Sequence, residues 1–127
     1  MMFGLNYVLH KKVSVDNELS VTKISRNFWR VNESWKLSHY TVPTGFISNA
    51  ASVYRWLWWL FTPAGELFEA SIAHDYAYHS KVVSRELADI MFYKLMLLYG
   101  VPKWRAKLAY FGVRLGGKSR YGKRTYN

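Results

Sequence analysis

The chain has 127 residues, of which 50% are hydrophobic and 18% aromatic, so a disordered protein is excluded and one domain with a real core is expected. It has no cysteine, which excludes disulfides, thiolate catalysis and cysteine-ligated zinc. Its formal net charge is +10, which favours partners that carry phosphates, anionic lipids or acidic side chains.

The first residues, MMFGLNYVLHKK, place a short apolar run before a basic pair. This order is the reverse of that in a signal peptide, so export by that route is not expected. Residues 5–47 then alternate apolar and polar side chains, with turn residues at Asp16-Asn17 and at 32–34. The pattern predicts three or four antiparallel strands. The sequence PTGFISNAA, residues 43–51, carries Pro and Gly and predicts a connecting loop.

Helices are predicted from residue 52 to residue 115. Ser52 can cap a short first helix through VYRWLWWLF, and a second helix is predicted over 66–79. Ser84 is a good cap for a third helix from Arg85 to Tyr99, which Gly100 and Pro102 end. Pro102 can begin a fourth helix, whose apolar positions Leu108, Phe111 and Leu115 recur at spacings of three and four residues.

These elements predict a single α+β domain over residues 1–117, with a small N-terminal antiparallel sheet and a helical half built on an antiparallel helix hairpin. Residues 118–127 are predicted to form a flexible basic tail. No apolar segment reaches the roughly 20 residues that a membrane-spanning helix needs.

The stretch SIAHDYAYHS holds the chemistry-bearing residues of the second helix. His74 and Tyr78 stand one turn apart on one face, among alanines that allow another helix to approach closely. The natural neighbour is the third helix, and Asp89 is the acidic residue best placed to face His74. A histidine held by a buried carboxylate has a fixed tautomer, as a general base requires. Asp75 projects elsewhere and is a candidate calcium ligand.

The sequences HDYAY and ADIMF resemble the catalytic helices of the phospholipase A2 superfamily, whose motifs read His-Asp-x-x-Tyr and Ala-Asp-x-x-Phe. The resemblance covers about 25 residues. It implies that His74 is the base, Asp89 its partner, Tyr78 a hydrogen-bonding support and Asp75 a calcium ligand. The calcium loop of that family is rich in glycine, whereas this chain offers Gly45 alone, whose carbonyl would be a further ligand.

A longer stretch, from TVPTGFISNAASVYRWLWWLF to GVPKWRAKLAYFGVRLGG, resembles a small-protein family of tailed bacteriophages and prophages, domain of unknown function 1353. Two positions depart from the family pattern: Asn49 stands where an aspartate is more common, and Tyr54 where a proline is. The resemblance implies a phage protein in the cytoplasm of the infected host, or associated with the virion. It implies no activity.

Trp58 and Trp59 are candidate contacts with a membrane interface or a partner, backed by the basic tail residues Lys118, Arg120, Lys123 and Arg124. Core packing is the simpler explanation of the tryptophans. The basic segment equally suits nucleic acid or acidic phage structural proteins, and six tryptophans favour an oligomer or assembly member.

Three functions follow as hypotheses. The preferred one is a phage-encoded phospholipase A2-like hydrolase that uses the His74–Asp89 dyad, with calcium at Asp75, at a membrane or cell envelope. The alternatives are a non-enzymatic virion or assembly protein with a basic docking tail, and a nucleic-acid-binding protein. A dyad open to a groove favours chemistry, whereas a sealed dyad favours a structural role.

Overall fold

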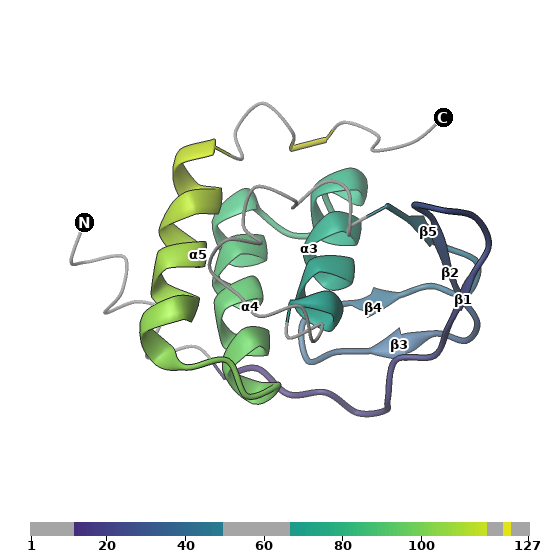
Figure 1. Cartoon of the computed structure of the whole chain (residues 1–127), viewed down its shortest axis with the longest axis horizontal. Helices are drawn as coiled ribbons and strands as arrows, with labels where there is room; N and C mark the ends of the chain where they lie inside the picture. Colours follow the sequence, from purple (N-terminus) through teal and green to yellow (C-terminus); the bar gives the residue numbers. More distant parts are fainter. Residues whose placement is uncertain (1–11, 50–66, 117–120, 123–127) are drawn as a thin grey trace.

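The computed structural model describes residues 12–49, 67–116 and 121–122 (Figure 1). Short strands come first and helices follow, which confirms the predicted α+β class. The strands are β1 (Val21–Lys23), β2 (Trp29–Val31), β3 (Trp35–Lys36), β4 (Thr41–Val42) and β5 (Ile47–Ser48). The helices are α3 (Phe68–Ser80), α4 (Arg85–Leu98) and α5 (Lys103–Gly116).

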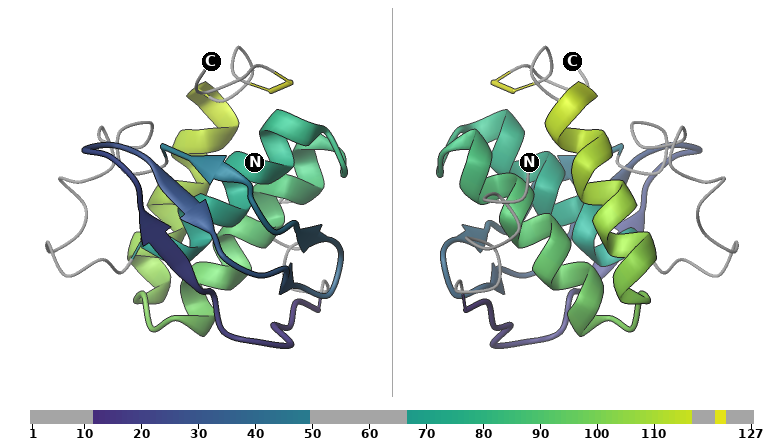
Figure 2. Two further views of the ribbon diagram at one scale, coloured as in Figure 1. Left: turned by 90° about the vertical axis from the view of Figure 1, so that its right-hand side faces the viewer. Right: turned by 90° about the vertical axis from the view of Figure 1, so that its left-hand side faces the viewer.

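The strands form two small antiparallel sheets, one in the order β1-β2-β5 and one that pairs β3 with β4. Asn17, in the first predicted turn, joins the chain before β1 to the backbone at β3. Its Nδ2 donates to the carbonyl of Ser34 at 2.9 Å, and its Oδ1 accepts from the backbone N–H of Lys36 at 2.7 Å. Strands of two or three residues have few ladder hydrogen bonds of their own, so such side-chain bonds matter for their stability. Figure 2 shows the strands as a layer on one side of the helices.

The helix pair α3 and α4 forms the predicted antiparallel hairpin. Lys81 ends α3 in a left-handed conformation (φ 56°), with its N–H bonded to the carbonyl of Ala77. Ser84 caps α4, as predicted, by accepting from the N–H of Leu87 at 3.1 Å. At the other end Gly100 has φ 94°, a conformation that favours glycine, and the helix stops there as the sequence indicates.

The core lies between α3 and α4 and continues onto the strand layer. Ala70, Ala73 and Ala77 are fully buried on α3, and their small side chains let α4 approach closely. Trp35 fills the strand side and Phe92 the helix side. Helix α4 lies between α3 and α5, and the strands lie on the other side of α3 (Figure 1).

Helix α5 packs on α4 through a face that does not include Leu108 or Leu115. Its buried residues are Ala106, Ala109, Tyr110 and Val113. Leu108 and Leu115, whose spacing predicted the helix, are 46% and 88% exposed. The spacing therefore predicted the helix correctly and left open which side meets α4, because both sides of α5 carry apolar residues.

Several predictions fall outside the described residues: the first helix with Trp58 and Trp59, and the basic residues Lys118, Arg120, Lys123 and Arg124. Within the predicted tail, Tyr121 and Gly122 are described and contact the end of α3. Among the described helices, none has the length and apolar character needed to cross a bilayer.

Candidate active site

Asp89 of α4 is the centre of a buried polar network. Its Oδ1 lies 2.6 Å from Nε2 of His74 and accepts a hydrogen bond from the hydroxyl of Tyr78 at 2.7 Å. The exposed fractions are 0% for Asp89, 1% for His74 and 3% for Tyr78. The structure therefore brings together the three side chains that the sequence named for catalysis.

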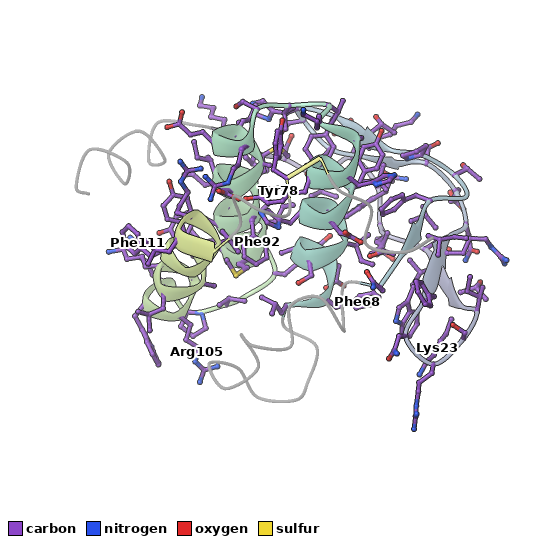
Figure 3. All side chains as sticks on the ribbon, turned by 90° about the horizontal axis from the view of Figure 1, so that it is seen from above. Lys23, Phe68, Tyr78, Phe92, Arg105 and Phe111 are labelled. Carbon is purple, nitrogen blue, oxygen red and sulfur yellow. The ribbon has the colours of Figure 1, made fainter. Side chains whose placement is uncertain are left out.

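The helix hairpin explains this convergence. His74 and Tyr78 are four residues apart on α3, so both side chains point from one face. The turn between the helices is short, and Asp89 lies one turn into α4, on the side that faces back to α3. Tyr78 and Phe92 lie between the two helices in Figure 3, and their rings flank the imidazole of His74 at centroid distances of 4.1 and 4.7 Å. Sequence spacing and helix packing together fix the position of the His74 imidazole.

Two arginines that the sequence pattern did not predict complete the network. Arg114 of α5 donates from Nη1 to Oδ2 of Asp89 at 2.8 Å. Arg85 donates from Nε to the Tyr78 hydroxyl at 3.2 Å and from Nη2 to the carbonyls of Val113 and Arg114. A signal for Arg85 was present, because it precedes Asp89 by four residues on one helix face. Predicting the contact of Arg114 with Asp89 would have required knowledge of how α5 packs on α4.

The network keeps Asp89 ionised. Burial alone would raise the pKa of the Asp89 carboxyl, but the hydrogen bond and charge of His74, with hydrogen bonds from Tyr78 and Arg114, outweigh it and hold that pKa below its usual range. Burial and the Asp89 charge raise the pKa of the Tyr78 phenol, so this side chain remains a donor. Because an ionised carboxylate only accepts hydrogen bonds, Nε2 of His74 carries the proton that faces Asp89.

Residues 23–113 match a family described as protein of unknown function (DUF1353). The chain belongs to this DUF1353 family. The matched region contains His74, Tyr78, Arg85 and Asp89, and Arg114 follows its last residue. No curated protein and no solved structure matches the chain.

In this DUF1353 chain, Asp75 belongs to a second buried polar contact. It is 1% exposed, and its Oδ2 accepts from the hydroxyl of Ser48 on β5 at 2.6 Å. Gly45 lies in the exposed turn between β4 and β5, and its N–H donates to the carbonyl of Val31. Among the described residues, Gly45 and Asp75 are not joined by a hydrogen bond.

A calcium ion requires six to eight oxygen ligands. Residues 12–49, 67–116 and 121–122 contain no group of three acidic or histidine side chains that could hold a metal. Among these residues Asp75 accepts a hydrogen bond from the hydroxyl of Ser48. Calcium at Asp75 stays a prediction, and no catalytic step of the proposed mechanism depends on it.

The two other histidines of the described residues, His39 and His79, make no hydrogen bond to Asp89 among those residues. His39 is exposed and contacts the hydroxyl of Ser38, while His79 is half-buried near the end of α3. His10 is outside the described residues.

Proposed function

We propose that this chain is a bacteriophage-encoded hydrolase that cleaves an ester or related carbonyl bond at a membrane or cell envelope, with His74 as general base. The observation that carries the proposal is the shared contact of His74 and Tyr78 with one oxygen of Asp89. It supports the proposal because His74, Tyr78 and Asp89 are the residues to which the phospholipase A2 resemblance assigns the base, its support and its partner.

In the proposed mechanism, Asp89 holds the Nε2 proton of His74, so Nδ1 is the basic nitrogen of the neutral ring. Nδ1 takes a proton from a water molecule while the water oxygen attacks the carbonyl carbon. The imidazolium that forms is stabilised by the Asp89 carboxylate and returns the proton to the leaving group. Tyr78 and Arg114 keep the carboxylate fixed during both transfers. Because His74 is buried, turnover requires a movement that exposes Nδ1 to substrate.

The composition of the network supports a function beyond packing. Burying a charged network usually stabilises a fold no better than apolar side chains of the same volume would. The neighbouring core is apolar, so an apolar contact could join α3, α4 and α5 at lower cost. A histidine, a tyrosine and an ionised carboxylate with a shifted pKa are typical of functional sites.

Burial also favours a second candidate, a non-enzymatic virion or assembly protein. With His74 at 1% exposure and Asp89 at 0%, the dyad is sealed as a structural network would be. In that role the network holds the helix hairpin together, and the basic residues dock onto acidic neighbours.

A hydrolysis assay on mixed phospholipid vesicles separates the two candidates. If His74 is the base, His74→Gln abolishes fatty-acid release, while His39→Gln, a matched change at an exposed position, leaves the rate unchanged. Circular dichroism confirms that both variants fold. Running each reaction with calcium and with a chelator tests the calcium prediction, together with calorimetric titration of Asp75→Asn. Release that persists in folded His74→Gln would reject the mechanism, and no release from the wild type would favour the assembly role.

A further inference from the structure

Helix α5 carries an exposed apolar stripe on its outer side. Trp104 is 60% exposed, Leu108 46% and Leu115 88%, and the half-buried Phe111 lies between them along the helix. Figure 3 places Phe111 on the side of α5 that faces away from α4, and the right-hand view of Figure 2 shows α5 in front, opposite the strands. We name Trp104, Leu108, Phe111 and Leu115 the outer stripe.

The outer stripe is continuous. At about 100° per residue, its four members fall within an arc of about 60° and extend over about 16 Å of helix. The residues that pack on the core, Ala106, Ala109, Tyr110 and Val113, occupy the opposite side of the helix. Trp104, Leu108 and Leu115 are therefore additional to the face that α5 uses for folding, while Phe111 is partly buried against the core.

Basic side chains flank the outer stripe on both sides. Lys103 and Lys107 project along one border and Arg105 along the other, where its guanidinium lies 5.4 Å from the centre of the Trp104 ring. The sequence of α5, KWRAKLAYFGVRLG, contains no acidic residue. A helix surface with Trp, Leu and Phe between cations has the composition of helices that lie in the interface of an anionic bilayer.

We propose that the outer stripe of α5 docks on an anionic phospholipid surface. In this arrangement α5 lies parallel to the bilayer, Trp104 and Leu115 enter the headgroup boundary, and Lys103, Arg105 and Lys107 contact lipid phosphates. The proposal does not depend on hydrolysis, because an assembly protein could dock in the same way.

The charges distinguish this partner from two others. A second copy of the same face would bring cations against cations, which opposes a symmetric dimer. A nucleic-acid backbone would attract the lysines but would leave exposed leucines without a favourable contact. Anionic lipid satisfies both the cations and the apolar residues.

Flotation of the full-length protein with phosphatidylglycerol/phosphatidylcholine vesicles tests the proposal. The variant Leu108→Ser/Leu115→Ser removes stripe residues that are exposed, so its fold should be unchanged, and we expect its vesicle binding to fall by at least about tenfold. The matched control is Ile24→Ser/Val82→Ser, which removes two exposed apolar side chains elsewhere and should bind as the wild type does. Lys103→Gln/Lys107→Gln should weaken binding to anionic vesicles, whereas Lys23→Gln/Lys36→Gln should not.

The proposal would be overturned if Leu108→Ser/Leu115→Ser and its control lost vesicle binding equally. It would also be overturned if Leu108→Ser/Leu115→Ser bound vesicles as strongly as the wild type. Binding that depends on the lysines alone would also overturn it, because the contact would then be electrostatic and would serve nucleic acid equally. Duplex DNA is therefore included as a competing probe, and we expect it to show no dependence on Leu108 or Leu115. His74→Gln should bind vesicles like the wild type, so failure of hydrolysis and failure of docking give different results.

Discussion

Arg114 on α5 donates from Nη1 to Oδ2 of Asp89 on α4 at a distance of 2.8 Å. The carboxylate is fully buried, whereas the arginine side chain is 32% exposed. Arg114 thus reaches from the surface into the hairpin and supplies a positive charge to the carboxylate that also holds His74. The ion pair links the third helix of the described fold directly to the candidate dyad.

Replacing Asp89 with asparagine should destabilise the protein strongly. The variant leaves Arg114 without its counter-charge and replaces one of the two carboxylate oxygens that accept from His74, Tyr78 and Arg114 with an NH2 group. Breaking a buried pair of this kind costs about 3 kcal/mol. Urea unfolding measures the change. Glu86→Gln, an exposed change on the same helix, should alter the free energy of unfolding by less than about 0.5 kcal/mol. Equal small effects in both variants would show that the network contributes little to stability.

The stability should also depend on pH in the acid range. The ordinary pKa of the Asp89 carboxyl is 3.8, and in the folded protein it is lower. The unfolded chain therefore takes up the proton first as pH falls, and the stabilisation from Asp89, complete well above pH 3.8, is lost as pH falls through the folded-state pKa. The stability difference between wild type and Asp89→Asn, measured by urea unfolding at several pH values, should shrink in this window. A constant difference would contradict the lowered pKa.

Two tyrosines should respond in opposite ways to loss of the hydroxyl. The hydroxyl of Tyr93 is buried and has no hydrogen-bond partner among the described residues, so Tyr93→Phe should be neutral or stabilise the protein by up to about 1 kcal/mol. The hydroxyl of Tyr40 donates to the carbonyl of Ala73 at 3.0 Å, so Tyr40→Phe should destabilise it by about 1 kcal/mol. Thermal unfolding of both variants checks the contrast. Destabilisation by Tyr93→Phe would point to a bonded partner such as water.

Tyr121 should contribute to folding although it lies in the predicted tail. Its hydroxyl donates to the carbonyl of Val83 at 2.6 Å, its ring packs on Tyr78, and the next N–H, of Gly122, donates to the carbonyl of Tyr78 at 2.7 Å. Tyr121→Ala removes these side-chain contacts and should cost about 2 kcal/mol. Chemical denaturation compares it with Tyr121→Phe, which should lose only the hydrogen bond. An unchanged midpoint for Tyr121→Ala would place the domain boundary near residue 117, as the sequence predicted.

The sequence predicted the parts of this fold that depend on local spacing. Ser84 and Gly100 marked the ends of α4 correctly, and the helix hairpin followed from the short segment between two periodic patterns. The spacing of His74, Tyr78 and Asp89 was sufficient to place them together. Contacts that join distant elements were missed, because neither Arg114 nor Ser48 has a local pattern that reveals its partner. For the same reason, the sequence did not determine which face of α5 packs on α4.

Two buried hydrogen bonds join the strand layer to α3, from Ser48 to Asp75 and from Tyr40 to the carbonyl of Ala73. Strands of two or three residues are not stable alone in water, so their folded conformation depends on packing against the helix that they contact. The two halves of the chain should consequently lose structure in one cooperative transition. Hydrogen exchange would then report nearly equal protection for the slowest amides of β2 and α3, two segments that belong to different kinds of secondary structure and to one unit of folding.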